Sequence, residues 1–244
     1  MYTPNVLLKK LLLFFLAWLG FSQLSTAQKV SPELARADSA FDAGAYQLAY
    51  RQYRGLMRQE AVASPRLLLR MAYVQEGLGH HPAALYYLHM ALARQPRLAT
   101  WRKMAELARN QRLTGYPETW RQDLQLTFRR YYYLGLQMLL LGAVVGGTLL
   151  LVRRQRVERG WWVAYGTYIL LTGIYLNLLG TERAALVVHP RAALMTGPSA
   201  GAAWLTTVTA GDRLVVQGQQ DTWYRVQWQG QDAYIRTQDL LLVR

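Results

Sequence analysis

The side chains that most often carry out chemistry in proteins are few in this sequence and lie far apart. The 244 residues include no cysteine, which excludes disulfides, cysteine-ligated metals and thiol catalysis. His81 and His89 are eight residues apart with no carboxylate near them in the sequence, so we do not expect a metal site there. The only close acidic pair, Asp38 and Asp42, is one helical turn apart and is expected on a solvated face. Glycine-rich phosphate loops, serine elbows and H-E-x-x-H motifs are absent. We therefore expect no enzyme activity and no cofactor.

The N-terminus has the features of an export signal. Lys9 and Lys10 precede an apolar core of about 11 residues, and the small residues Ser25 and Ala27 follow. These features are typical of a secretory signal peptide, here residues 1–27. The alternative is an uncleaved anchor, but a spanning helix needs roughly 20 apolar residues, so cleavage is favoured. In either case the chain from residue 30 onward is expected to be translocated.

Residues 28–117 are expected to form a domain of short, repeated helices. Ser64 precedes a proline, and an N-cap serine followed by proline is a typical helix start. Gly44 and Gly79 are 35 residues apart and are predicted to end two helices. A period near 34 residues indicates stacked helical hairpins. A further helix, about Leu98–Arg112, is expected to cap the last hairpin.

This repeat resembles the tetratricopeptide family. The matching positions are Gly44, Tyr46, Ala49 and Tyr53 in one unit, and Gly79, Ala84, Leu88, Ala91 and Pro96 in the next. The resemblance implies helix pairs that cross closely at the small residues and form a concave groove for protein partners. Arg66, Arg70 and Tyr73 are the first-helix residues that we expect to face this groove and bind a partner.

Two charge-free stretches follow a linker helix expected at residues 118–130. Residues 131–152 and 160–180 can each cross a bilayer, since the first stretch of 22 residues reaches about 33 Å at about 1.5 Å per residue. The loop at residues 153–159 contains four arginines and one glutamate and is expected to stay in the cytoplasm. The export signal independently places residue 130 on the other side. Both arguments predict a transmembrane hairpin with the flanking domains outside the cytoplasm.

Several small and aromatic residues in these spans are expected to pack the hairpin. Gly142 and Gly146 form a G-x-x-x-G motif, which permits close approach of two helices. Tyr168 and Tyr175 belong to a tyrosine stripe on the second span. The alternative is that both features form a seam for a span of a partner protein.

Gln137 and Asn177 are the only amide side chains in the two predicted spans. Counted from the cytoplasmic ends, their depths differ by two residues, which is about 3 Å at the rise of a helix. We therefore predict a hydrogen bond between them across the hairpin, worth about 0.6 to 2 kcal/mol.

Residues 184–244 are expected to form a small all-β domain. Short β-rich runs are broken here by Gly, Pro and Asp. The predicted strands include Leu186–His189, Arg213–Gln217, Trp223–Trp228 and Asp232–Arg236. In the third of these, apolar Tyr224, Val226 and Trp228 alternate with polar residues, so one sheet face is expected to be buried. About five short strands in roughly 60 residues indicate a small barrel.

This domain resembles the bacterial SH3 (SH3b) family. The resemblance rests on the turn Gly197-Pro198-Ser199, on Gly211 before a strand, on Trp223-Tyr224-Arg225-Val226 in place of W-Y-x-V, and on Gly230 to Ile235 in place of G-x-x-G-W-V. It implies a domain that binds wall peptides or proteins through an aromatic cleft, which Trp223 and Tyr234 can line. Trp223 can equally belong to the core, because aromatic residues supply most of the burial in a barrel of this size.

The chain is strongly basic, with 28 Lys and Arg against 14 Asp and Glu and a net charge of +14. Because the basic domain is expected to be exported, nucleic acid is not an expected partner. A basic helical domain beside a membrane can contact the lipid bilayer through anionic headgroups, or an acidic protein. The alternative is compositional, since 24 of the 28 basic residues are Arg and can reflect GC-rich coding.

The order of the modules resembles the BatE-type proteins of the bacterial aerotolerance operon. The most recognisable pieces are the segment EGLGHHPAALYYL around Gly79 and the segment Trp223-Tyr224-Arg225-Val226. The resemblance implies partners among membrane-anchored von Willebrand A-domain proteins of the Bat type and a MoxR-type ATPase.

The expected fold is therefore a multi-domain membrane protein. It combines tetratricopeptide hairpins, a two-helix transmembrane hairpin and a C-terminal SH3b-like barrel, in the bacterial cytoplasmic membrane with both soluble domains periplasmic. Our first hypothesis is a non-enzymatic scaffold that binds protein partners through the repeat groove. The second is a peptidoglycan-binding protein that acts through the C-terminal domain, with the repeats as a spacer.

Overall fold

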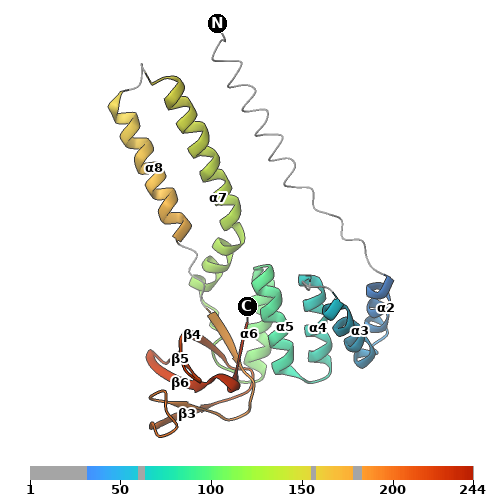
Figure 1. The fold of residues 1–244 in the computed structure, drawn as a ribbon. Helices are drawn as coiled ribbons and strands as arrows, with labels where there is room; N and C mark the ends of the chain where they lie inside the picture. Colours follow the sequence, from blue (N-terminus) through green and yellow to red (C-terminus); the bar gives the residue numbers. More distant parts are fainter. Residues whose placement is uncertain (1–31, 60–63, 155–157, 178–182, 244) are drawn as a thin grey trace. The chain divides into compact units, whose positions relative to one another are not determined.

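A computed structural model describes residues 32–59, 64–154, 158–177 and 183–243 of the chain (Figure 1). The export signal predicted at residues 1–27 lies outside this described part. Two compact units are present: one contains residues 32–135 together with the C-terminal domain, and the other contains residues 136–177.

Within the described residues, the helical domain has five short helices that pack in sequence order. These are α2 (Pro32–Asp42), α3 (Tyr46–Gln59), α4 (Pro65–Gly77), α5 (His81–Arg94) and α6 (Leu98–Asn110). Helices α2 and α3 pack as one pair, α4 and α5 as the next, and α6 packs against α5 (Figure 1). Gly44 and Gly79 follow the first helix of each pair at φ +74° and +78°, a conformation that favours glycine. The predicted helix ends at these two glycines are confirmed.

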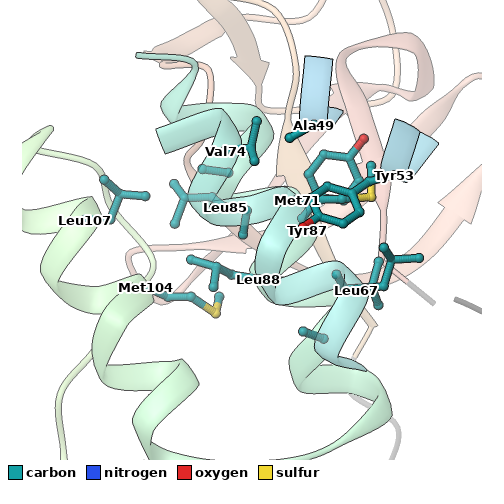
Figure 2. Packing of buried hydrophobic residues seen from close by; sticks show 14 of the residues in the cluster. Ala49, Tyr53, Leu67, Met71, Val74, Leu85, Tyr87, Leu88, Met104 and Leu107 are labelled. Carbon is teal, nitrogen blue, oxygen red and sulfur yellow. The ribbon is translucent and has the colours of Figure 1, made fainter. Parts of the chain in front are cut away.

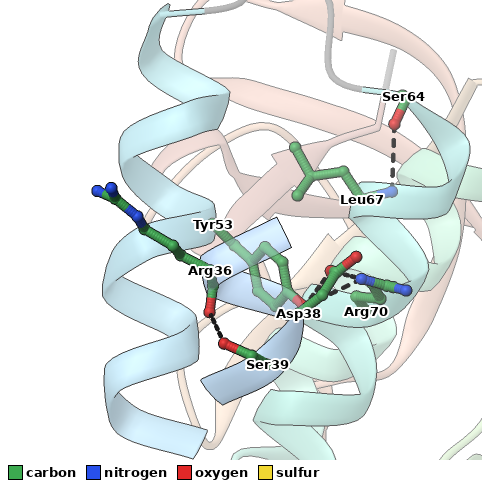
Figure 3. Close-up of polar contacts among 7 residues, drawn as sticks. All are labelled: Arg36, Asp38, Ser39, Tyr53, Ser64, Leu67 and Arg70. Carbon is green, nitrogen blue, oxygen red and sulfur yellow. Dashed lines mark hydrogen bonds and ion pairs between the residues drawn. The ribbon is translucent and has the colours of Figure 1, made fainter. Parts of the chain in front are cut away.

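Helix α4 begins at the predicted serine cap. The side-chain oxygen of Ser64 accepts a hydrogen bond from the backbone N–H of Leu67 at 3.3 Å, and Pro65 occupies the first turn (Figure 3). Helix α6 is shorter than predicted, since it ends at Asn110 rather than Arg112. Arg112 has φ +55°, which turns the chain out of the helix.

The core of the helical domain combines small residues with large ones (Figure 2). Ala49, Ala72 and Ala84 are at most 1% exposed, and Tyr53 and Leu85 are completely buried. Small side chains let neighbouring helices approach closely, while the large ones fill the space between them. This packing is the arrangement expected from the repeated alanines, and the assignment to the tetratricopeptide family stays a prediction.

Helix α7 runs without interruption from Trp120 to Val152, a length of 33 residues. The linker helix predicted at residues 118–130 and the span predicted at residues 131–152 are therefore one helix. Within the described residues, α7 is the one helix that is long and apolar enough to cross a membrane.

Helix α8 (Arg159–Asn177) has 19 described residues, and its five Trp and Tyr side chains lower its mean hydropathy. The second span, predicted at residues 160–180, extends past the described end of this helix and stays a prediction. In the loop predicted at residues 153–159, Arg153 and Arg154 form a turn.

Helices α7 and α8 are joined by tyrosine hydroxyls of α8. Tyr168 donates a hydrogen bond to the carbonyl oxygen of Leu139 at 2.6 Å, and Tyr165 donates one to that of Ala143 at 2.8 Å. Tyr175, also on the predicted stripe, is half-buried. These bonds place polar hydroxyls on backbone carbonyls within an apolar helix pair, where such contacts contribute to association.

The glycines of α7 make room for these tyrosines. A Cβ atom on Gly142 would lie 2.5 Å from the Tyr168 hydroxyl, and one on Gly147 would lie 2.6 Å from the Tyr165 hydroxyl. Gly146 is less constrained, because its Cβ would lie 3.5 Å from the ring of Tyr165. The G-x-x-x-G region therefore packs the hairpin, and Gly147 makes a closer contact than the predicted Gly146.

The predicted hydrogen bond between Gln137 and Asn177 is wrong for the described chain. Asn177 donates its side-chain amide to the carbonyl oxygen of Gly173 at 3.0 Å, in its own helix. Both Gln137 and Asn177 are exposed on the helix pair. Similar depth along two helices does not place two side chains on facing surfaces, and the tyrosines occupy the facing surface.

The C-terminal domain is a single antiparallel sheet of seven strands in the described chain, in the order β3-β2-β6-β5-β4-β1-β7. The strands are β1 (Arg183–Val187), β2 (Ala192–Met195), β3 (Trp204–Val208), β4 (Arg213–Gln220), β5 (Trp223–Trp228), β6 (Gln231–Arg236) and β7 (Leu240–Leu242), with a 3-10 turn at Thr237–Asp239. Leu194, Val226, Ala233 and Ile235 are completely buried in its core. Strand β5 has the predicted bounds. The prediction of five strands was too low, because neither of the short strands β3 and β7 was recognised.

Candidate functional site

The predicted partner-binding residues of α4 have two different environments. Arg66 and Tyr73 are exposed, with Tyr73 at 48%. The Arg70 guanidinium instead forms an ion pair with Asp38 of α2 (Figure 3). The Tyr53 hydroxyl donates a hydrogen bond to the same carboxylate at 2.8 Å. Arg70 therefore joins α2 to α4, and its charge is used inside the domain.

Burial changes the chemistry of this ion-pair network. It lowers the pKa of Arg70 and raises the pKa of Tyr53 to about 12, with a smaller contribution from Asp42 to the latter. Arg70 remains cationic despite the lowered pKa, because arginine titrates far above neutral pH. The network therefore joins α2, α3 and α4 through a charged pair and a tyrosine hydroxyl.

The exposed part of the predicted site continues onto α6. Lys103 pairs with Glu76 of α4 at 2.8 Å, and its ammonium lies 5.9 Å from the centroid of the Tyr73 ring. The hydrogen bond that Lys103 donates to the Glu76 carboxylate is the main cause of the raised pKa of Lys103. We call the surface formed by the exposed Arg66 and Tyr73 together with the half-buried Glu76 and Lys103 the α4 face. It presents one aromatic ring among charges of both signs.

The predicted aromatic residues of the C-terminal domain lie on one face of its sheet. Trp223 pairs directly with Arg236, and Arg225 pairs directly with Tyr234, in the register of β5 and β6. Directly paired residues point to the same side, and side chains two apart on a strand share a face. We call this set, Trp223, Arg225, Tyr234 and Arg236, the outer face. The core residues Val226 and Ile235 have the opposite parity.

The outer face combines aromatic rings with two guanidinium groups. The Arg236 guanidinium carbon lies 5.6 Å from the centroid of the Trp223 ring, within cation–π distance. Trp223 is only 8% exposed, whereas Tyr234 is half-buried and both arginines are exposed. Trp223 is therefore buried but lies outside the main core cluster of the sheet, and Tyr234 is the more accessible ring.

Strand β2 extends this aromatic surface. Met195 pairs directly with Tyr234 and with Trp204 of β3. Trp204 is 63% exposed, and Met195 is half-buried. An exposed indole beside a thioether and a tyrosine is an unusual surface in a small domain, and such surfaces often bind ligands.

The loop between α6 and α7 is bound to the turn before β4. Asp212, which is 4% exposed, accepts hydrogen bonds at 2.7 Å from the backbone N–H groups of Thr114 and Thr209. The backbone N–H of Arg213 donates to the carbonyl oxygen of Thr114 at 3.1 Å. Asp212 and Thr114 are 98 residues apart, so these bonds join the C-terminal domain to the helical domain.

Side chains on both sides extend this junction. The Tyr116 hydroxyl donates to the carbonyl oxygen of Gly211 at 2.8 Å, and burial raises the pKa of Tyr116. The Arg213 side chain donates to the carbonyl oxygen of Gly115 at 3.3 Å. Its guanidinium carbon lies 5.4 Å from the ring centroid of Trp101, which is buried in the helical domain.

Apolar contacts complete the junction. Leu186 of β1 belongs to the same buried cluster as the helical core, and Val243 packs against that cluster. Gly211, at φ +99°, is so close to Leu113 that an added Cβ would lie 2.9 Å from it. The helical and C-terminal domains therefore share a polar and an apolar interface.

The junction was not identified from the sequence. No local pattern pairs Thr114 with Asp212, because the pairing depends on chain segments that meet only after folding. The signal that the sequence offered was a glycine at position 115, where the structure has φ +89°, a conformation that favours glycine.

Comparison with known proteins agrees with the C-terminal geometry. Residues 191–240 match the family model described as bacterial SH3 domain. Neither curated proteins nor solved structures gave a match to the chain. The matched segment runs from the turn before β2 to the start of β7 and contains the whole outer face. The chain therefore contains a bacterial SH3 domain at residues 191–240.

Proposed function

We propose that this protein is a membrane-anchored, non-enzymatic binding protein whose SH3 domain binds peptidoglycan or a protein through the outer face. The observation that carries this proposal is the grouping of Trp223, Arg225, Tyr234 and Arg236 on one side of β5 and β6. The membrane anchor is supported by α7, which is long and apolar enough to span a bilayer.

The chemistry of the outer face favours a ligand that has both carboxylates and small apolar groups. Arginine binds carboxylates with two parallel hydrogen bonds, and aromatic rings cover methyl and peptide groups. Peptide stems of bacterial cell wall have both kinds of group. A protein segment with acidic and apolar residues has them as well, so wall and protein ligands are both compatible with the surface.

The junction supports the proposed topology. The helical domain precedes α7 and the SH3 domain follows α8, yet Thr114 and Asp212 are hydrogen bonded. Two domains that share an interface lie on the same side of a membrane, so the chain between them crosses the membrane an even number of times. We accordingly propose two spans, the second including α8, with both domains outside the cytoplasm.

A sedimentation assay tests the proposed ligand class. The full chain in non-ionic detergent is mixed with purified peptidoglycan, and the bound fraction is measured in the pellet. Tyr234→Ala and Arg236→Gln should each weaken binding by about tenfold, as expected for central contacts. Arg191→Gln, the same charge change at an exposed turn of the domain, is the control. Equal losses in Arg236→Gln and Arg191→Gln would contradict recognition by the outer face.

The α4 face favours a second function, as a protein scaffold. Tyr73 is largely exposed although it is aromatic, and it lies beside Lys103 and one turn from Arg70. Exposed aromatic residues flanked by charge are typical centres of protein interfaces. The resemblance in module order to BatE-type proteins makes membrane-anchored von Willebrand A-domain proteins the candidate partners, in a Bat/MoxR-type stress-tolerance complex.

Crosslinking in native membranes tests the scaffold function. A photo-crosslinking residue at position 73 should trap a defined partner, and Arg66→Ala should reduce the yield several-fold. Position 48, where the exposed Leu48 lies on α3, is the control position. The same products from both positions would show that the contacts are non-specific.

A further inference from the structure

A cavity lies where α5, α6 and α7 meet the SH3 domain. It has a volume of about 130 Å³, which is more than one water molecule requires. Its polar lining comes from His89 of α5, Gln122, Gln125 and Arg129 of α7, and Arg213 of β4. The cavity is therefore built from segments of the chain that are far apart in sequence.

His89 gives this cavity an unsatisfied buried group. The residue is 5% exposed, and its Nε2 has no hydrogen-bond partner within the described part of the chain. Burial, with a smaller effect of the Arg213 charge, lowers the pKa of His89 to about 3, so the imidazole is neutral at physiological pH. In the tautomer that carries its proton on Nε2, the neutral imidazole can donate one hydrogen bond into the cavity, and a buried donor without a partner is costly.

The other lining groups define the charge of a suitable ligand. Arg129 and Arg213 contribute guanidinium groups, Gln122 and Gln125 contribute amide donors, and none of the described lining residues is acidic. Two guanidinium groups with amide and imidazole donors suit an anion that has several acceptor oxygens. A phosphate group has such oxygens in a tetrahedral arrangement.

The position of Arg129 on α7 suggests where the phosphate comes from. Arg129 is two residues before Tyr131, at which the charge-free stretch of α7 begins. At about 1.5 Å per residue, its backbone lies about 3 Å along the helix from the start of that stretch. Basic groups close to a membrane surface attract the headgroups of anionic lipids.

We propose that this cavity binds a phosphate ester, namely the headgroup phosphate of an anionic phospholipid, between the helical domain, α7 and the SH3 domain. The apolar lining, which includes Leu92, Leu126 and Val243, can contact the carbon atoms next to the phosphate. Such a ligand would contact all three segments and so stabilise their junction. This site is separate from the outer face, so the proposal does not depend on the ligand of the SH3 domain.

Native mass spectrometry of the full chain in zwitterionic detergent tests the site. The probes are dihexanoyl phosphatidylglycerol, inorganic phosphate and the zwitterionic dihexanoyl phosphatidylcholine. We expect one phosphatidylglycerol to bind per chain, with low occupancy of other sites. Excess inorganic phosphate should compete with phosphatidylglycerol for the site, and the chain should retain phosphatidylcholine more weakly. Binding of inorganic phosphate without phosphatidylglycerol would overturn the lipid as the source.

Paired variants distinguish the cavity from general surface charge. Arg129→Gln should weaken phosphatidylglycerol binding by about tenfold, whereas Arg129→Lys should lose less, because the charge is kept and only the forked geometry is lost. Arg130→Gln is the matched control, since Arg130 is exposed and does not line the cavity. Equal losses in Arg129→Gln and Arg130→Gln, or no binding by the native chain, would overturn the proposal.

A second readout covers a folding defect in the Arg129 variants. Phosphatidylglycerol should raise the melting temperature of the native chain and of Arg130→Gln, but not that of His89→Gln or Arg129→Gln. If phosphatidylglycerol raised the melting temperatures of His89→Gln and Arg129→Gln as much as that of the native chain, binding in the cavity would be contradicted. Peptidoglycan sedimentation of the same variants should be unchanged, which separates this site from the outer face.

Discussion

A single methyl group at Gly115 is expected to separate the helical domain from the SH3 domain. A Cβ atom there would lie 2.0 Å from the carbonyl oxygen of Arg213 and 2.9 Å from its carbonyl carbon, whereas real Cβ contacts are essentially never below 3.0 Å. Gly115→Ala therefore requires the two backbones to move apart by about 1 Å.

The expected loss of stability has two parts. The φ of +89° costs alanine about 1–2 kcal/mol. The backbone movement also lengthens the bonds from Arg213 N–H to Thr114 at 3.1 Å, from Thr114 N–H to Asp212 at 2.7 Å, and from the Arg213 side chain to Gly115 at 3.3 Å. With net contributions of about 1 kcal/mol for the neutral bond and about 1.5–3 kcal/mol for each of the two charged bonds, loss of all three would cost about 4–7 kcal/mol, which is the upper bound for this second part.

Two other glycines separate the backbone cost from the junction cost. Gly79 in the helical domain and Gly230 in the SH3 domain have φ of +78° and +84°, and an added Cβ would meet nothing within 4 Å. Gly79→Ala and Gly230→Ala should therefore lose only the 1–2 kcal/mol of the backbone conformation.

Scanning calorimetry of the full chain in detergent micelles provides the measurement. The native chain and both controls should unfold the helical and SH3 domains in one shared transition. Gly115→Ala should split this transition in two, because the interface no longer couples the domains. A single transition in Gly115→Ala, lowered no further than in the controls, would refute the role assigned to the junction.

Three further perturbations test the hairpin, the ion-pair network and the buried histidine. Gly142→Ala should weaken the α7–α8 pair by about 1–3 kcal/mol, because its Cβ would lie 2.5 Å from the Tyr168 hydroxyl, and Tyr168→Phe should relieve this cost. Steric-trap unfolding of the two single variants and the double variant measures the coupling between the two positions. Additive effects of the two substitutions would contradict the contact. Arg70→Gln should lower the free energy of unfolding, measured in urea, by about 1–3 kcal/mol, since it leaves a partly buried Asp38 carboxylate without its cation. Arg66 is exposed, so Arg66→Gln should change the free energy of unfolding by less than about 0.5 kcal/mol. The pKa of His89 is lowered to about 3 in the folded chain, so as the pH falls the unfolded chain binds the proton first. Stability is therefore lost as pH falls from about 6.5 towards 3, at up to about 1.4 kcal/mol per pH unit. His89→Gln should flatten the dependence of stability on pH between pH 6.5 and 5, above the range where carboxylates titrate, and an unchanged dependence would count against the burial of His89.

Local chemistry was sufficient to predict several elements. The cap at Ser64, the turns at Gly44 and Gly79 and the full extent of β5 depend on residues near in sequence, and each was predicted. The short strands β3 and β7 were harder, since three to five residues have little periodicity of their own. They are stabilised by pairing with β2 and β1.

The candidate sites were predicted less completely for the same reason. Trp223 and Tyr234 were selected as aromatic residues, but only the register of β5 and β6 places them with Arg225 and Arg236 on one face. Arg70 was expected in a groove, and only the position of Asp38 on another helix explains why its charge is used inside the domain. Gln137 and Asn177 had similar depths, but helix rotation decides which residues face each other.

The amino-acid sequence by itself determined the order of the modules, because apolar runs, glycine turns and β-rich segments are properties of neighbouring residues. The family match at residues 191–240 likewise follows from local sequence. Only the tertiary structure decided that the SH3 domain is bound to the loop before α7, through Asp212 and residues about a hundred positions earlier. Hydrogen bonds between such distant segments leave no periodic trace in a chain, since each partner needs only a suitable donor or acceptor at the point where folding brings them together.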